Sequence, residues 1–254
     1  MPTSSHYGQV NRKVFSNLFG VGIRKISMKK HLASIAIILS FALGLALLLY
    51  PYIADRFNAH SQSRAVASHR NAVRKMDSQD LTEYWEAARN YNKELLSKES
   101  RFVFSDEDRS EYQSLLNASG SGIMGILEIA AIGVRLPIYH GTSEAVLQLG
   151  IGHFEGSSLP VGGSGTHCAV TGHRGLPAST LLTKLDRVVP GDTFALQILD
   201  EYLWYQVDQI NVVSPEDLSN LEIDPNMDYC TIITCTPYGI NSQRLLVRGI
   251  RVDE

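Results

Sequence analysis

The sequence predicts a mainly β catalytic region, folded as a closed or nearly closed β-barrel, which follows a helical region and one transmembrane helix. Short apolar runs separated by turn signals fill the chain after Gly122, and this spacing is typical of small barrels. A helical period precedes them, and nineteen uncharged residues occur earlier still. We therefore divide the chain into residues 1–31, 32–53, 54–119 and 120–254.

The uncharged run Leu32–Tyr50 predicts a transmembrane helix, because about 20 apolar residues span a hydrocarbon core. A buried core helix is one alternative, but a soluble helix of this length normally keeps a polar face. A cleavable signal peptide is another, with an apolar core of about 7–15 residues. The run is longer than that, and no small-residue site follows it directly. We expect an uncleaved anchor over residues 32–53.

The charges around this anchor predict its orientation. Six basic residues and no acidic residue precede it, so the positive-inside rule places tail 1–31 in the cytoplasm and the remainder outside the cell membrane. The six are Arg12, Lys13, Arg24, Lys25, Lys29 and Lys30. Without them, 17 of the 23 Lys and Arg remain against 26 Asp and Glu. This acidic balance argues against nucleic acid as a partner, whereas the lipid bilayer is an expected one.

Residues 54–119 predict a membrane-proximal helical region. Leu81, Ala88, Tyr91 and Leu95 recur at helical intervals, with Tyr84 or Trp85 between them, so at least one amphipathic helix is expected to pack its aromatic stripe on a core. A turn or helix-start signal lies at residues 105–109. The Gly- and Ser-rich residues 117–122 mark the boundary to the barrel.

The region after residue 120 predicts seven strands and one short helix. Two strong turn signals, at residues 190–192 and 200–201, separate consecutive strands. The strands are expected at Ile126–Val134, Leu136–Tyr139, Thr166–Thr171, Thr193–Leu199, Tyr202–Val213, Tyr229–Cys235 and Arg244–Val252, and the helix at Ser143–Gln148.

Three reactive side chains lie at strand ends. Cys235 ends a β-branched run before Pro237 and Gly239, His173 follows another run between two glycines, and Arg244 opens a third. A cysteine, a histidine and a cation make up a thiol acyl-transfer site, as nucleophile, proton shuttle and carbonyl clamp. Taken singly, His173 could be an ordinary polar residue and Arg244 a surface charge.

The remaining polar candidates are expected to be structural. Cys168 and Cys230 lack CxxC or HxxxH spacing, which argues against metal binding and favours buried thiols; a disulfide is the alternative. We assign no chemistry to His140 and His167, although either could line the cleft. Arg248 and Arg251, the other two basic residues of the last strand, are expected to serve structure or solubility. No cofactor is expected. The glycine-rich residues 162–165 do not predict a phosphate-binding loop, because they lack a P-loop lysine and a following helix pattern.

From about Phe104 to Val252 the sequence resembles the sortases, and within them the pilus-assembling class C enzymes of Gram-positive bacteria. The resemblance rests on six segments, which read EI at 128–129, LPIYHGT at 136–142, EGSSLPVGG at 155–163, TGHRGLP at 171–177, TIITCTPYG at 231–239 and RLLVRG at 244–249. The family's cysteine motif is TLxTC, and Ile232 replaces its leucine here. The resemblance implies an eight-stranded sortase β-barrel.

The resemblance implies roles for the three side chains: Cys235 as nucleophile, His173 as general acid and base, and Arg244 as substrate or transition-state clamp. It implies cleavage of an LPxTG-type sorting signal between Thr and Gly, and transfer of the acyl group to a lysine of a pilin subunit. Pilins with such signals and acceptor lysines are the implied partners. The alternatives are a sortase that anchors proteins to peptidoglycan, a hydrolytic cysteine peptidase, and an inactive scaffold for pilus assembly.

Two departures from the class C pattern concern the ends of the catalytic region. Class C members generally carry a lid with an Asp-Pro-aromatic tripeptide, and the corresponding stretch here is Phe102-Val103-Phe104, which lacks the Asp. A degenerate lid that does not lock the cleft is therefore expected. Many members also end in a second hydrophobic helix, which the residues up to Glu254 do not predict.

Overall fold

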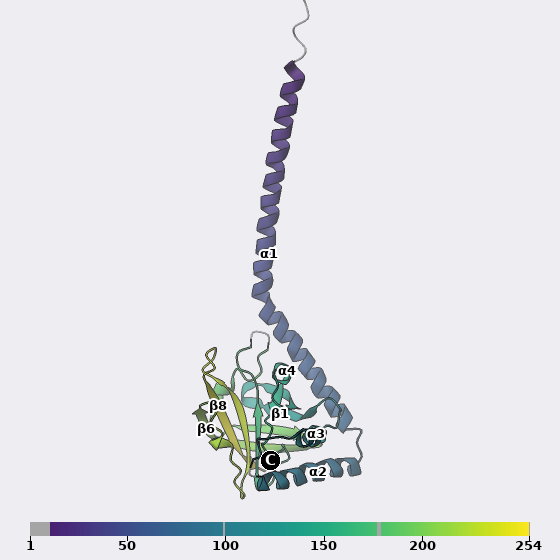
Figure 1. Cartoon of the computed structure of the whole chain (residues 1–254), viewed down its shortest axis with the longest axis vertical. Coiled ribbons are helices and arrows are strands. Elements are labelled where there is room, and N and C mark those ends of the chain that lie inside the picture. The colour runs from purple at the N-terminus through teal and green to yellow at the C-terminus, as the bar shows by residue number, and fades with distance from the viewer. Residues whose placement is uncertain (1–10, 99, 177–178, 254) are drawn as a thin grey trace, which may run out of the picture. The chain divides into compact units, whose positions relative to one another are not determined.

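The computed structural model describes residues 11–98, 100–176 and 179–253, with side chains described from residue 31 on. The chain divides into two compact units, Met1–Pro51 and Tyr52–Glu254. Figure 1 shows helix α1 (Asn11–Val73), which passes through both units, and the strands and shorter helices of the second. The side chains of the predicted basic tail lie outside the described residues, apart from His31.

Helix α1 contains the predicted membrane anchor. Its apolar side chains are exposed on all sides, with Leu39 at 64%, Phe41 at 73% and Leu48 at 68%. Among the described residues it is the one helix long and apolar enough to cross a membrane, and this agrees with a single-pass anchor. The helix includes Pro51 and extends beyond residue 53, the predicted end of the anchor, as far as Val73. The more polar residues after the anchor continue it as an amphipathic stretch.

In the second unit, helices pack their apolar faces on the barrel. The last turns of α1 bury Val66, His69 and Val73 at helical spacing. Helix α2 (Ser78–Ser97) starts at a capping box on Asp77, and it buries Trp85, Ala88, Tyr91, Asn92 and Leu95, which confirms the predicted amphipathic stripe. Helix α3 (Asp106–Ser114) starts at Ser105. The signal at residues 105–109 is therefore a helix start.

The described residues contain eight strands, which close into a barrel and confirm the predicted fold. Their order around the barrel is β1-β2-β3-β4-β7-β8-β6-β5. Strands β2 and β3 pair in parallel, as do β4 and β7, and the other neighbours are antiparallel. The strands are β1 (Ile123–Ile129), β2 (Val134–His140), β3 (Ile151–His153), β4 (Thr166–Thr171), β5 (Thr193–Ile198), β6 (Glu201–Val213), β7 (Asp228–Thr236) and β8 (Gln243–Val252). The short helices are α4 (Glu144–Leu149), η1 (Ala130–Ile132), η2 (Leu185–Arg187) and η3 (Ser219–Leu221).

Strand β7 is buried on both faces, which explains its nearly continuous run of Ile and Thr. One face, with Cys230 and Ile232, belongs to the main hydrophobic core. The opposite face carries Ile233, which packs with Ala169 of β4 and Leu246 of β8 in a second, smaller cluster. Because side chains alternate along a strand, Cys235 lies on the same side as this smaller cluster.

Two elements differ from the sequence prediction. The predicted strand Ile126–Val134 is wrong at its end, since β1 stops at Ile129 and a 3-10 turn follows. That turn closes at Gly133 in the left-handed conformation, with φ 66°, and the chain then reverses to pair β2 with β1. Strand β3 was not predicted, because three residues are too few to show an alternating pattern.

Candidate active site

Strand β7 brings Cys235 to the edge of the barrel. The strand ends one residue later, at Thr236, and Gly239 of the following turn has φ 76°, a conformation that suits glycine. Cys235 is partly exposed, whereas Cys168 and Cys230 are buried. The exposed thiol therefore lies where a buried strand opens into a loop.

His173 follows β4, the parallel neighbour of β7. Thr171 lies in register with Ile233, and the Gly172 N–H continues the ladder by donating to the Ile233 carbonyl at 3.1 Å. The Thr234 hydroxyl donates to the Gly172 carbonyl at 2.8 Å. Two hydrogen bonds to β7 thus fix the residue directly before His173, and so they fix the position of its backbone relative to Cys235.

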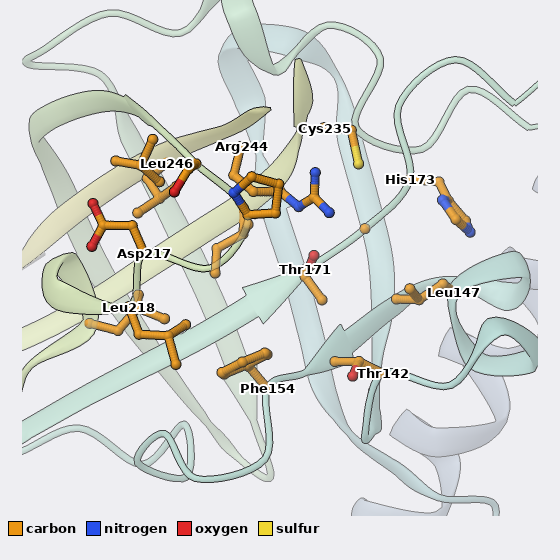
Figure 2. A pocket seen from close by; sticks show the side chains of 16 residues that line it. Thr142, Leu147, Phe154, Thr171, His173, Asp217, Leu218, Cys235, Arg244 and Leu246 are labelled. Atoms are coloured by element: carbon orange, nitrogen blue, oxygen red, sulfur yellow. The ribbon is translucent and has the colours of Figure 1, made fainter. Parts of the chain in front are cut away.

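Arg244 lies opposite Cys235 in the antiparallel pair of β7 and β8. Its guanidinium donates hydrogen bonds to the carbonyls of Gln243 at 3.1 Å and Asn241 at 3.3 Å. In Figure 2 the guanidinium and the Cys235 thiol extend into the same region. The register alone therefore places a permanent cation across from the thiol.

The three predicted residues line one pocket, with a volume of about 290 Å³. Figure 2 shows its side chains, which extend from strand ends and from the loop between β6 and β7. The segment from the end of β6 to η3 supplies apolar residues, among them Leu218 and Leu221, and the polar residues Ser214 and Asp217. The pocket is lined by Thr142, Leu147, Phe154, Thr171, Gly172, His173, Val213, Ser214, Pro215, Asp217, Leu218, Leu221, Ile233, Cys235, Arg244 and Leu246.

The His173 imidazole has a carboxylate neighbour that the sequence analysis missed. Its Nε2 lies 3.4 Å from Oε1 of Glu144, the first residue of α4, and the two side chains are 23% and 68% exposed. In Figure 2 the imidazole extends away from the Cys235 sulfur, on the side of α4. No sequence motif indicates Glu144 as a partner of His173, because the two residues lie 29 positions apart in the sequence.

The loop after His173 is held from two sides. The Leu182 N–H donates to the His173 carbonyl at 3.2 Å, which folds the loop back on its start. Asp55 of α1 accepts hydrogen bonds from the backbone N–H and the hydroxyl of Thr180, both at 2.8 Å. Residues 177–178 of this loop lie outside the described residues, and residue 177 is the last one of the segment TGHRGLP.

The stretch at residues 102–104 packs beside the pocket and is absent from its lining residues. The Phe102 ring lies 5.8 Å from that of Phe154, a pocket residue. Next to it, Arg101 donates to the carbonyl of Leu221, another pocket residue, at 2.8 Å. Phe104 packs on Tyr112 of α3, with ring centroids 6.1 Å apart. The stretch thus supports the pocket wall from behind.

His140 and His167 do not line the pocket. The nitrogens of His140 contact the carbonyls of Gly122 and Leu115, at 3.0 and 2.7 Å. Those of His167 contact the Glu222 carbonyl and the Thr231 hydroxyl, at 2.8 and 2.7 Å. Burial lowers the pKa of His167 to about 4. Both histidines join loops to strands.

Comparison with known proteins identifies the family of this chain. A family model described as a sortase domain matches residues 127–252. The solved sortase C1 of Streptococcus agalactiae is 46% identical, with a TM-score of 0.73, covering 75% of this chain and 99% of that one. The solved sortase C of Streptococcus pneumoniae is 41% identical, with a TM-score of 0.66, covering 75% and 97%.

The curated relatives, which are less similar in sequence, are also sortases. Sortase A of Bacillus anthracis is 25% identical over 224 residues, or 87% of this chain and 95% of the relative. Sortase D of Bacillus subtilis is 28% identical over 131 residues, and the chain spans 63% of its length. This chain belongs to the sortase family of cysteine transpeptidases, and it groups with the pilus-related class C enzymes.

Proposed function

We propose that the chain is a pilus-assembling sortase, which cleaves an LPxTG-type sorting signal between Thr and Gly and joins the acyl group to a pilin lysine. The observation that carries the proposal is that Cys235, His173 and Arg244 line one pocket. The solved sortase C of Streptococcus pneumoniae, described for its pilin substrate specificity, supports the choice of substrate.

In the first half-reaction, the Cys235 thiolate attacks the threonine carbonyl of the signal. The Arg244 guanidinium, opposite Cys235 in the β7–β8 register, donates hydrogen bonds to the developing oxyanion. His173 gives a proton to the departing glycine amine. A thioester forms between Cys235 and threonine as the peptide bond breaks, which requires His173 to turn from Glu144 toward the thiol.

In the second half-reaction, a lysine amine attacks the thioester. His173 accepts a proton from the amine, an isopeptide bond forms and the Cys235 thiolate is released. Water competes with the amine and gives hydrolysis as a side reaction. The apolar wall formed by Val213, Leu218 and Leu221 suits the leucine and proline of the signal, because burying apolar side chains favours binding.

We also propose that the catalytic unit works outside the cell membrane, with tail 1–31 in the cytoplasm. Six basic residues before the apolar part of α1 support this orientation. A single-pass anchor next to the unit would hold the enzyme where exported pilins leave the membrane.

Thioester formation tests the chemistry. We expect the full chain, purified in detergent and incubated with an LPxTG-type peptide, to gain the mass of the peptide's acyl part in intact-protein mass spectrometry. Cys235→Ala should gain nothing, and Arg248→Ala should behave as the wild type because Arg248 pairs with Asp208 and does not line the pocket. No adduct on the wild type, with tested variants folded, would contradict the proposal.

The acceptor distinguishes polymerisation from anchoring and hydrolysis. A pilin that carries both the sorting signal and an acceptor lysine should give an isopeptide-linked pilin dimer. A product joined only to a peptidoglycan amine would favour an anchoring sortase, and free acid alone would favour a peptidase. An intact signal with each acceptor would favour the scaffold.

A further inference from the structure

The chain has three cysteines, and the two that line no part of the pocket are direct neighbours. Cys168 of β4 and Cys230 of β7 are Cα partners in the parallel register. They are exposed by 2% and 0% respectively, and both belong to the main core.

The placement suits a covalent bond between the two strands. Adjacent strands lie about 4.7–4.9 Å apart, and disulfides join Cα atoms that are usually about 4.4–6.8 Å apart. Both side chains leave their strands on the same face, since both belong to the main core with Val170 and Ile232. The usual spacing of neighbouring strands therefore falls within the range that a disulfide bridges.

Cys235 is excluded from this pairing by its position on β7. It lies five residues after Cys230, so the alternation along a strand directs the two side chains to opposite faces. Cys230 belongs to the main core, whereas Cys235 lines the pocket with Ile233. A bond within the core leaves the pocket thiol free.

We propose that Cys168 and Cys230, which are thiols in this structure, form a disulfide that ties β4 to β7 when the chain folds outside the cytoplasm. This inference rests on the proposed extracytoplasmic location. The bond would join the two strands that carry His173 and Cys235, each five residues beyond its cysteine. It would therefore fix the strands that hold the pocket without using the nucleophile.

The oxidant is a disulfide of the extracytoplasmic compartment, either a small molecule or a thiol oxidoreductase. One cysteine thiolate attacks this disulfide, which forms a mixed disulfide and releases one thiolate of the oxidant. The second cysteine attacks the mixed disulfide and releases the other. One protein S–S bond forms, the oxidant's S–S bond breaks, and the two cysteine protons end on the two released thiols. Both cysteines are buried in the folded barrel, where an oxidant cannot reach them, so the exchange occurs before the core closes.

The test counts thiols in the full chain that carries Cys235→Ala. The protein is isolated in its membrane without reductant, denatured, treated with N-ethylmaleimide and weighed by intact-protein mass spectrometry. We expect no added maleimide before reduction and two after it. Adding Cys168→Ala should give one maleimide in both cases. Two maleimides without reduction would overturn the proposal.

Thermal unfolding tests the role of the bond. The disulfide would close a loop over residues 169–229, and loops of this size are expected to raise the melting temperature by roughly 10 °C. The oxidised full chain should therefore melt about that much higher than the same chain after reduction. Equal melting temperatures would overturn the tying role. The thiol count does not depend on turnover, so failure here is distinct from failure to form the Cys235 thioester.

Discussion

Two arginines of β8 lie four residues apart in contrasting surroundings. Arg244 lines the pocket opposite Cys235. Arg248 forms an ion pair with Asp208 at 2.6 Å, and its guanidinium lies 4.2 Å from the centre of the Tyr229 ring. The sequence prediction that Arg248 serves structure agrees with these contacts, since such pairs hold a strand face together without reaching the pocket.

Arg244→Ala is expected to lower the rate of thioester formation by about 10²–10³, the usual loss for one oxyanion donor. Arg244→Lys should recover only part of this, because an ammonium lacks the planar fork of the guanidinium. Single-turnover kinetics with the LPxTG-type peptide provide the measurement. Arg248→Ala is the matched control and should stay within about threefold. Equal losses for Ala variants at 244 and 248 would contradict the role of Arg244.

The contact of Glu144 with His173 gives a second prediction at this scale. The carboxylate lies 3.4 Å from the imidazole and its side chain is 68% exposed. Exposed pairs contribute about 0.2–1 kcal/mol, so Glu144→Gln should change kcat by less than about fivefold and leave KM unchanged. Steady-state kinetics of transfer to a pilin lysine measure both. A loss near that of Cys235→Ala would make Glu144 a required partner of His173.

At the scale of elements, the strand ends of the catalytic site were predictable and the loops around it were not. Strands β4 and β7 carry apolar runs that end next to His173 and at Cys235, and β8 carries one that begins at Arg244. Runs of this kind show in the sequence. The wall from Val213 to Leu221 has no such pattern, because its apolar side chains face a pocket made by strands from elsewhere in the chain. Tertiary contact alone defines it.

The contact between α1 and the loop after His173 is another feature without a sequence signal. Asp55 accepts two hydrogen bonds from Thr180 at 2.8 Å, and each such bond contributes about 0.5–1.5 kcal/mol. Asp55→Ala is therefore expected to increase hydrogen exchange of residues 179–184 and to lower kcat by about 3–10-fold. The alkylation rate of Cys235 should not change, since β7 is untouched.

A double-mutant cycle tests whether Asp55 acts through Thr180. Thr180→Val removes the hydroxyl and keeps the backbone N–H, so its effect should be smaller than that of Asp55→Ala. The double variant should lose no more activity than Asp55→Ala alone, because the partners share one interaction. Additive losses would show that Asp55 acts on the enzyme by another route.

At the scale of the whole molecule, the sequence predicted the closed barrel and the membrane helix because both depend on long patterns. A run of nineteen uncharged residues and a series of seven apolar runs are too long to arise from local variation in composition. Short elements were missed for the opposite reason. Strand β3 has three residues, and the 3-10 turn after Ile129 was read as a continued strand because Ala130 and Ile132 are apolar. The division at residue 119 stays a prediction.

The orientation of the chain across the membrane gives the last prediction. The basic residues before the apolar run should hold the tail in the cytoplasm, because translocating them across the bilayer is unfavourable. In intact protoplasts, external protease should digest the catalytic unit and spare an epitope at the N-terminus. Replacing Lys29 and Lys30 with Glu should raise the digested fraction of the epitope.

The matched control replaces Lys93 and Lys98, two residues of the second unit that follow the anchor by about 40 residues. The positive-inside rule counts charges mainly within about 15–20 residues of a membrane segment, so this pair should leave the orientation unchanged. An epitope digested in the wild type would place the catalytic unit in the cytoplasm. The Cys168–Cys230 pair would then meet a reducing compartment and remain as two thiols, so the orientation measurement and the thiol count must agree.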